Sequence, residues 1–290
     1  MKLFAPLLAC FLPAALASEA AFEVASTDIQ LNATVKGNHG PFKVSKEDVH
    51  VGGYVCGGNQ GAVVYYPTDN ENPSPVISFA HGFTAGGELV DPDYSTILEG
   101  VASFGYVIIA LKSAPENFCW EETKDQIRSL EWIKTSKFAD MIDYTKKTGI
   151  MGHSMGGGNT HLSAQNAEAV AEHNIGAAVA LHPCYVTGSS LVPIFYGTGS
   201  LDTIVPSSQV KPQYQATHGV AKVYANIEGA THLEPNTVGP NRWTDYVAAM
   251  FGCYLYDMPE ACNTVFGKGD GTLCSGKDPM PMTECKHEGY

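Results

Sequence analysis

Residues 147–158 read KTGIMGHSMGGG and join an apolar run to a serine held between glycines. The run predicts a strand that ends at Met151, and the small residues from Gly156 onward indicate a helix. Gly152-His153-Ser154-Met155-Gly156 matches the Gly-X-Ser-X-Gly pattern of a sharp strand-to-helix turn, whose flanking positions leave no room for side chains. Such a turn exposes the hydroxyl of Ser154 beside a helix N-terminus, which favours a nucleophile over a simple Gly-rich turn.

The same alternation of strand and helix extends along the chain on both sides of this turn. Short runs rich in β-branched residues alternate with amphipathic stretches of helical length, which is typical of a mostly parallel central sheet with helices on both faces. The predicted strands are 62–66, 76–80, 106–111, 147–151, 177–181, 192–196 and 222–227. The predicted helices are 96–104, 121–135, 156–173, 207–218 and 243–251. Within 121–135, Ile127, Leu130 and Ile133 recur at three-residue steps and form one apolar face for the sheet.

A Gly-X-Ser-X-Gly turn in this setting predicts the α/β-hydrolase fold. The sequence contains no internal repeat and no linker that would divide it into two such units. Only about ten residues separate Leu181 from Val192, where this fold commonly carries a cap or lid domain, so we expect none. The site should therefore be open to solvent and to large or surface-bound substrates.

The first 17 residues have the pattern of a secretory signal peptide. Lys2 precedes an apolar run that ends at Leu16, and the segment closes on Ala-Leu-Ala. Two prolines interrupt the run, whereas a membrane anchor needs roughly 18 apolar residues or more. Cleavage after Ala17 would leave 273 of the 290 residues (290 − 17) as an exported, soluble protein.

The charge of the chain limits its partners. The formal net charge is −13 and becomes −14 when Lys2 leaves with the signal peptide, and the basic residues are scattered. An acidic chain without basic runs disfavours nucleic acids and anionic membranes as partners.

Cysteine usage also fits an exported protein. Eight cysteines are present and Cys10 lies in the signal peptide, so seven remain, of which most should pair and at least one should stay a free thiol or form an intermolecular bridge. Four of them crowd the C-terminal end, at Cys253, Cys262, Cys274 and Cys285. The Gly- and Pro-rich residues 259–290 look too polar for core burial, so we expect disulfides to staple this tail to a catalytic domain of residues 18–258. The spacings lack the close cysteine pairs of a zinc ribbon, which disfavours a zinc site.

A serine nucleophile needs a base and an acid, which follow it in the order acid, then histidine, in this fold. The loop 197–206 carries Asp202 after one predicted strand, and Gly229-Ala230-Thr231-His232 follows the next. We predict Ser154, Asp202 and His232 as a catalytic triad in which His232 accepts the serine proton and Asp202 orients the imidazole. The alternative interpretations are a helix-capping carboxylate for Asp202 and a surface histidine for His232.

The other nine histidines are interpreted as structural, including His81 and His153. Glu234, two residues after His232, lies on the wrong side of the base in chain order to serve as the acid. A tetrahedral intermediate also needs two backbone N–H donors aimed at its oxyanion. We predict the N–H groups of Met155 and of Phe83, which lies in the loop 81–87, as this oxyanion hole.

With these residues in place, the chain resembles the bacterial cutinases and polyester hydrolases, including those that degrade poly(ethylene terephthalate). The resemblance runs from Gly40 to the C-terminal cysteines and rests on Val64-Tyr65-Tyr66-Pro67, residues 152–158, Leu201-Asp202-Thr203-Ile204 and Gly229-Ala230-Thr231-His232. It implies the same triad and oxyanion hole, an aromatic–methionine clamp formed by Phe83 and Met155, and a lidless cleft. It also implies a terminal disulfide on Cys262, with Cys274 as its partner.

One position departs from that family. Its members usually carry a tryptophan after the proline that follows the strand 177–181, where an aromatic substrate ring can stack. Here Cys184 takes the tryptophan position and Tyr185 is the neighbouring aromatic residue, which puts aromatic polyester activity in question. The predicted substrate-binding residues are Phe83, Met155, Cys184 and Tyr185. Cys184 is either a free thiol or a disulfide partner of Cys56 or Cys119.

These features predict a secreted, extracellular carboxylic-ester hydrolase that acts on polyester, cutin-like or lipid-like esters through an acyl-enzyme on Ser154. We expect a monomer whose partner is an ester substrate, polymeric or surface-bound, with no nucleic acid, no membrane span, no cofactor and no metal. Two alternatives stay open. One is an esterase for small soluble or pigment esters, because a fold does not dictate its substrate. The other is a binding protein that has kept the fold and lost catalysis.

Overall fold

The computed structural model describes residues 22–24, 33–35, 39–113, 119–237, 239–275 and 280–290. The strands are β1 (Phe22–Val24), β2 (Ala33–Val35), β3 (Val44–His50), β4 (Gly61–Pro67), β5 (Val76–Ala80), β6 (Val107–Lys112), β7 (Thr148–His153), β8 (Ile175–Leu181), β9 (Ile194–Gly199), β10 (Lys222–Ile227) and β11 (Met282–Glu288). The helices are α1 (Val90–Ala102), α2 (Glu122–Ile133), α3 (Met155–Ser163), α4 (Ala167–Glu172), α5 (Ser207–Ala216), α6 (Thr244–Leu255) and α7 (Pro259–Phe266). Short 3₁₀ helices are η1 (Gly87–Leu89), η2 (Ala139–Met141), η3 (Glu234–Asn236) and η4 (Leu273–Ser275).

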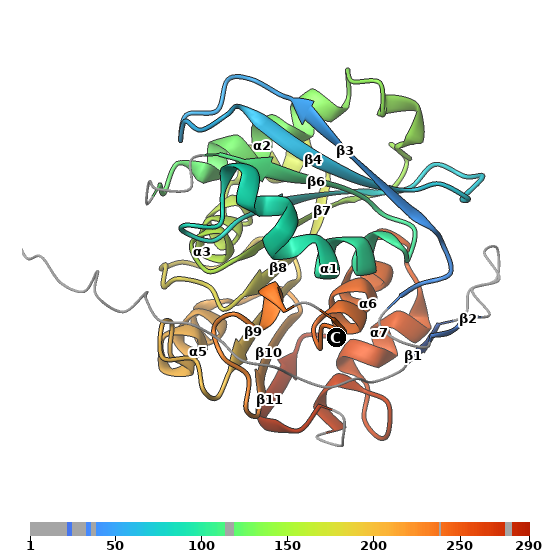
Figure 1. Ribbon diagram of the computed structural model, residues 1–290. Helices are drawn as coiled ribbons and strands as arrows, with labels where there is room; N and C mark the ends of the chain where they lie inside the picture. Colours follow the sequence, from blue (N-terminus) through green and yellow to red (C-terminus); the bar gives the residue numbers. More distant parts are fainter. Residues whose placement is uncertain (1–21, 25–32, 36–38, 114–118, 238, 276–279) are drawn as a thin grey trace, which may run out of the picture.

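A nine-stranded sheet forms the centre of the molecule, in the order β11-β10-β9-β8-β7-β5-β6-β4-β3 (Figure 1). The strands from β10 to β6 in this order run parallel, whereas β11, β4 and β3 pair antiparallel at the two ends. The carboxyl ends of parallel strands meet at one edge, so the loops after β5, β7, β8, β9 and β10 gather there.

Helices cover both faces of this sheet (Figure 1). One hydrophobic cluster includes residues of α1, α6 and α7, and a second includes residues of α2 and α5 and Met155 of α3. Because both faces are covered, β5, β6 and β8 are buried along their whole length. In α2 the predicted apolar face is present, with Leu130 and Ile133 buried and Ile127 packed against the core.

The predicted α/β-hydrolase architecture is confirmed, and all seven predicted strands are present with ends shifted by up to three residues. The connection from β8 to β9, residues 182–193, is described throughout and contains no helix or strand, as expected without a cap domain. The predicted helix 156–173 is wrong in its middle, where the chain divides it into α3 and α4. Asn166 adopts an extended backbone there, and its side chain accepts a hydrogen bond from the N–H of Ala169 to cap α4.

The C-terminal segment differs most from expectation. Residues 259–290 include α7 and the edge strand β11, and Ala261, Val265 and Phe266 of α7 are buried in the core. The expectation that this segment is too polar for core burial is therefore wrong. Its apolar residues recur at helical spacing, a pattern that the neighbouring glycines and prolines obscure. β3 was also not predicted, because an edge strand with alternating polar residues contains no apolar run.

Three disulfides are present, Cys56–Cys119, Cys253–Cys262 and Cys274–Cys285. The second attaches the C-terminal segment to α6, as expected for a staple, but the expected partner of Cys262 was wrong. The chain turns back after α6, which brings the Cα atoms of Cys253 and Cys262 to 4.6 Å. Cys184 belongs to none of the three disulfides in the described part of the chain. Cys10 and the predicted signal peptide, residues 1–17, lie outside the described residues.

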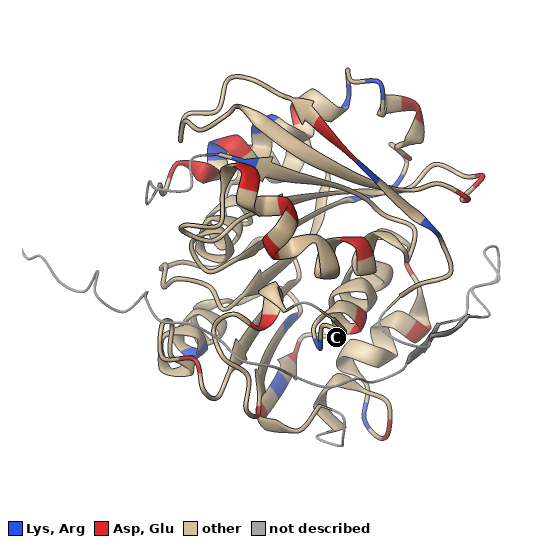
Figure 2. Cartoon of the chain, in the orientation of Figure 1, with Lys and Arg blue, Asp and Glu red and all other residues tan. Residues whose placement is uncertain are grey.

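Charge is unevenly distributed over the surface. Figure 2 shows Lys and Arg dispersed over several elements, whereas α1 carries Asp91, Asp93 and Glu99.

Within the described ranges we find no helix that combines the length and the apolar character needed to cross a bilayer.

Candidate active site

Ser154 lies at the turn between β7 and α3 with φ 57° and ψ −117°. This backbone is strained for a residue other than glycine, which is typical of a nucleophile at a strand-to-helix turn. A Cβ at Gly152 would stand 2.3 Å from the carbonyl oxygen of Gly156, and one at Gly156 would stand 2.2 Å from that of Ala80. Close packing therefore requires both flanking glycines, as the sequence pattern predicted.

The structure brings the three predicted triad residues into one hydrogen-bonded chain. His232 Nε2 lies 2.8 Å from Ser154 Oγ, and His232 Nδ1 lies 2.8 Å from Asp202 Oδ2. Asp202 follows β9 and His232 follows β10, so both reach the edge of the sheet where β7 ends. Because a carboxylate can only accept, Nδ1 donates and Nε2 keeps a lone pair for the serine proton. This arrangement is that of a base prepared to deprotonate Ser154.

The Asp202 carboxylate accepts four hydrogen bonds. Oδ1 accepts from the N–H groups of Ile204 at 2.9 Å and Val205 at 2.8 Å, and Oδ2 accepts from His232 and His182. Burial by itself would raise the pKa of Asp202, but the hydrogen bonds from the two histidines outweigh it and hold the pKa well below its usual range. Asp202 is therefore ionised at neutral pH and can stabilise an imidazolium at His232. Burial lowers the pKa of His232 by more than Asp202 raises it.

His182 is the residue that the sequence interpretation missed, since it was placed among the structural histidines. Its Nδ1 lies 2.8 Å from Asp202 Oδ2, and its side chain is fully buried. His182 follows β8 directly, at the same edge of the sheet as Asp202. That position is the signal in the sequence that could have identified it.

The predicted oxyanion hole involves the loop after β5 and the first turn of α3. Met155 is the first residue of α3, where backbone N–H groups have no acceptor within the helix. The carbonyl of Gly82 lies 2.8 Å from His81 Nδ1 and accepts from the N–H of Ala85 at 3.1 Å. Since the C=O and N–H of a trans peptide point in opposite directions, these bonds set the direction of the Phe83 N–H. The oxyanion role of Phe83 and Met155 stays a prediction.

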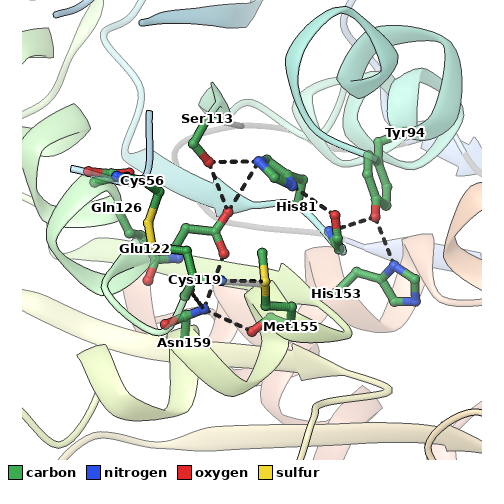
Figure 3. A network of polar contacts seen from close by, with 12 residues as sticks. Cys56, His81, Tyr94, Ser113, Cys119, Glu122, Gln126, His153, Met155 and Asn159 are labelled. Carbon is green, nitrogen blue, oxygen red and sulfur yellow. Dashed lines mark hydrogen bonds and ion pairs between the residues drawn. A yellow bond between two sulfur atoms is a disulfide. The ribbon is translucent and has the colours of Figure 1, made fainter. Parts of the chain in front are cut away.

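A chain of hydrogen bonds links this loop to the backbone of His232, and Figure 3 shows its part from Tyr94 to His153. The N–H of Gly82 donates to the Tyr94 hydroxyl at 2.9 Å, which lies 2.8 Å from His153 Nδ1. His153 Nε2 donates to the carbonyl of His232 at 2.9 Å, so Nδ1 of the neutral ring accepts from Tyr94. Burial, together with the nearby histidines, holds the pKa of His153 well below its usual value and keeps the ring neutral.

A second buried cluster supports His81 (Figure 3). His81 Nε2 lies 2.7 Å from Ser113 Oγ and 3.3 Å from Glu122 Oε1, and Asn159 Nδ2 donates to Glu122 Oε2 at 3.2 Å. Burial raises the pKa of Glu122 well above its usual value, and burial lowers the pKa of His81 to about 4. His81 is therefore uncharged at neutral pH, and burial favours the protonated form of Glu122. His81 supports the Gly82 peptide from within the core, which agrees with its structural interpretation.

A pocket of about 230 Å³ adjoins Ser154 and His232 and extends toward α1, where Asp93 lines it. Of the four predicted substrate-binding residues, the pocket lining includes Phe83. The Met155 side chain is buried, and its Sδ accepts from the N–H of Cys119 at 3.3 Å. Contact of Met155, Cys184 and Tyr185 with a substrate stays a prediction.

Two other sets of residues offer alternative chemistry. Glu234, the competing acid, forms a two-point ion pair with Arg242, with Nε–Oε1 at 2.5 Å and Nη2–Oε2 at 2.8 Å. His182, Asp202 and His232 lie close enough together to suggest a metal site. Both imidazoles donate from Nδ1 to the carboxylate, however, so these nitrogens have no lone pair for a metal. The three residues are therefore arranged as a hydrogen-bonded network.

Comparison with known proteins agrees with this geometry. A family model described as PETase, PET hydrolase-like, matches residues 22–257. Cutinase 1 of Thermobifida cellulosilytica is 29% identical over 222 residues, which are 73% of this chain and 78% of that protein. Cutinase est1 of Thermobifida alba is 31% identical over 210 residues, 68% of this chain and 65% of that protein. The bis(hydroxyethyl) terephthalate hydrolase of Streptomyces coelicolor is 27% identical over 221 residues, 71% of this chain and 65% of that protein.

The matched range contains Ser154, Asp202 and His232 together with every strand from β3 to β10. The segment that forms α7 and β11 lies beyond it. The family model covers well over half of the chain, and the chain therefore belongs to the PET hydrolase-like family.

Proposed function

We propose that this protein is a secreted serine esterase that hydrolyses polyester, cutin-like or lipid-like carboxylic esters through an acyl-enzyme on Ser154. Membership of the family identifies a carboxylic-ester hydrolase. The observation that supports the finer assignment is the hydrogen-bonded order Ser154, His232, Asp202 at a strained turn.

The reaction follows from the positions of the protons. His232 Nε2 takes the proton of Ser154 Oγ as Oγ attacks the ester carbonyl carbon, and the carbonyl oxygen becomes an oxyanion that the N–H groups of Phe83 and Met155 stabilise. The ester C–O bond then breaks, and the leaving alkoxide takes the proton from His232. In the second half, His232 removes a proton from water, the hydroxide attacks the acyl carbon, and Ser154 leaves with that proton.

The surroundings of Ser154 suit an ester that approaches from the surface. The connection 182–193 carries no cap, so a chain longer than the pocket can extend beyond it. Asp93 gives one wall of the pocket an acidic group, which disfavours an anionic acyl chain there. The names of the relatives, cutinases and a bis(hydroxyethyl) terephthalate hydrolase, favour polyester-type substrates over small soluble or pigment esters.

Export is supported by independent features of the chain. Three disulfides are typical of proteins that fold in an oxidising compartment. Residues 1–17 have the composition of a signal peptide. Sequencing the N-terminus of protein recovered from the medium tests the predicted cleavage after Ala17.

A substrate panel tests the function. Purified protein and Ser154→Ala would be assayed on p-nitrophenyl esters of increasing chain length and on aliphatic and aromatic polyester films. We expect turnover by the wild type on long esters and on a film, none by the variant, and melting temperatures within a few degrees of each other. Activity confined to short soluble esters would favour the small-ester alternative. If an organophosphonate does not label Ser154, the binding-protein alternative is correct.

Aromatic polyesters call for a separate test, because the family resemblance places Cys184 at a position that usually carries tryptophan. The ring of Trp120, which is 41% exposed, and the carbonyl of Cys184 both lie within 3.0 Å of the point where a Cβ of Gly158 would stand. We expect Cys184→Trp to add a stacking surface worth roughly 1 kcal/mol, which would raise the rate on aromatic film several-fold and change the rate on aliphatic esters little. Trp120→Ala, which removes the neighbouring ring, is the matched variant. Equal effects on both substrate types would place Cys184 outside the acyl cleft.

A further inference from the structure

Oδ2 of Asp202 accepts hydrogen bonds from two imidazoles, whereas a catalytic triad needs only one. We propose that His182 is a positioning residue for the ester hydrolysis proposed above, on which this inference rests. It shares Asp202 Oδ2 with His232, holds the carboxylate in the plane that orients His232, and makes His232 a weaker base than a carboxylate with a single imidazole would.

The backbone of His182 is built to bring its ring to Asp202. Its N–H donates to the carbonyl of Gly197 at 2.7 Å, which continues the pairing of β8 with β9. Its φ of 45° then turns the chain in a left-handed conformation that is uncommon for a residue with a side chain. A strained backbone persists when other interactions offset its cost in free energy, and the hydrogen bond from the side chain to Asp202 is such an interaction.

Among the described residues, the bond to Asp202 is the one hydrogen bond that the His182 ring forms. The His182 side chain is fully buried, and the edge of the ring meets Trp243 with centroids 6.0 Å apart and planes at 80°. Nε2 has no hydrogen-bond partner among the residues that the structure describes. A histidine kept in the core for packing alone would not need its Nδ1 aimed at an ionised carboxylate.

The effect on basicity follows from how Oδ2 is shared. Protonated His232 is stabilised by the negative charge on Oδ2, and a second donor on the same oxygen draws part of that charge away. Besides His182, two titratable groups face His232. Asp202 accepts from its Nδ1, and His153 donates from Nε2 to its backbone carbonyl. The hydroxyl of Ser154 faces its Nε2. His182 also opposes protonation of His232 through its charge interaction. Its removal should therefore make His232 easier to protonate.

The test compares His182→Ala with His182→Asn. Asparagine tolerates a left-handed backbone, and its amide nitrogen stands where the imidazole Nδ1 stood, so it can restore the donor without the ring. For His182→Ala we expect kcat to fall by about 10-fold or more with little change in KM. We also expect the acid limb of kcat/KM to move up by about 0.5 to 1 pH unit. His182→Asn should recover most of both. The matched control is His161→Asn, a buried histidine that contacts Gln213 and Tyr196 instead of the triad, and its acid limb should stay at the wild-type pH.

A second measurement does not need turnover. In protein with ¹⁵N-labelled histidine, NMR titration reports the pKa of His232 directly, and the wild type should show two low-field ring N–H protons, one from His232 and one from His182. Loss of the His182 proton in both variants and a raised His232 pKa in His182→Ala alone are the expected results. Only one low-field proton in the wild type, or an unchanged His232 pKa and acid limb in His182→Ala, would overturn the inference. Absence of esterase activity in the wild type would instead overturn the proposed function, while the NMR titration still tests the role of His182.

Discussion

Two buried histidine–carboxylate pairs stand at the site end of the sheet, and the pKa values of their carboxyl groups are shifted in opposite directions. Asp202 and His182 lie 2.8 Å apart on the side of the base, and Glu122 and His81 lie 3.3 Å apart beneath the predicted oxyanion loop. The pKa of Asp202 is held well below its usual range, whereas burial raises that of Glu122 well above it. The same two residue types therefore favour the ionised carboxylate in one place and the protonated acid in the other.

The number of donors accounts for the difference. Asp202 accepts two backbone N–H groups and two imidazole N–H groups, which compensate for its burial. Glu122 accepts two longer side-chain hydrogen bonds, from Ser113 Oγ at 3.4 Å and from Asn159 Nδ2 at 3.2 Å, and the nearby charge of Asp125 further raises its pKa. The proposed mechanism explains why this asymmetry would be useful. In that mechanism a negative charge beside His232 stabilises the imidazolium that forms, whereas a negative charge behind the predicted oxyanion loop would oppose the oxyanion.

The largest expected effect comes from replacing the carboxyl group of each pair in turn by an amide. Asp202→Asn should lower kcat by about 10⁴-fold, because the charge that stabilises protonated His232 is lost. Glu122→Gln should change kcat by only a few-fold, because Gln reproduces the size and the neutral state of the protonated acid. Steady-state kinetics on one p-nitrophenyl ester measures both. Comparable losses of kcat in the two variants would mean that Glu122 is ionised, which would contradict the opposite pKa shifts of the two carboxyl groups.

A change in Tyr94 tests whether the predicted oxyanion loop and the loop that carries His232 are coupled. Tyr94→Phe removes the hydroxyl between Gly82 and His153, leaving an N–H and an imidazole nitrogen unsatisfied in the core. We expect a loss of about 1–3 kcal/mol in the free energy of unfolding. We also expect kcat to fall by about 10-fold to 100-fold, because the oxyanion loop and the His232 loop lose their connection. Urea unfolding and kinetics measure these, and a stability loss with unchanged kcat would show that the chain supports only the fold.

The pH dependence of kcat/KM tests the pKa of His232 separately from the Glu122 pair. Because burial lowers the pKa of His232 by more than Asp202 raises it, the acid limb of kcat/KM should have its midpoint below the usual histidine value of about 6.5. Initial rates between pH 4 and pH 8 give this midpoint, after a check that the protein stays folded throughout. A midpoint above about 7 would mean that the charge of Asp202 dominates over burial.

The smallest effect concerns a third buried carboxyl, Asp245 in α6. Its Oδ1 has no hydrogen-bond partner within the described ranges, and burial raises its pKa to about 7. A folded pKa above the unfolded value means that its stability contribution is full at acid pH and is lost as the pH rises toward 7. Asp245→Asn should therefore raise the melting temperature by a few degrees at pH 8 and hardly at all at pH 4. An equal gain at both pH values would contradict the dependence of charge on donor number.

The parts of the site that could be predicted are those with local requirements. Ser154 was identifiable because its turn needs glycine on both sides, and each requirement is met within a few residues. Asp202 and His232 were identifiable because each follows a strand in the order that the fold imposes. The C-terminal segment was misjudged because its composition conceals a helix, and the partner of Cys262 was wrong because the return of α7 against α6 is a matter of packing.

The sequence alone therefore determined the parallel sheet, the turn at Ser154 and the chain order of the predicted triad, because backbone geometry and strand polarity are encoded in short segments. Only the tertiary structure decided that His182 meets Asp202 across 20 residues of sequence and that Glu122 reaches His81. It also decided the direction in which the pKa of each carboxyl group shifts, since that depends on the donors and the burial that surround each carboxyl in space.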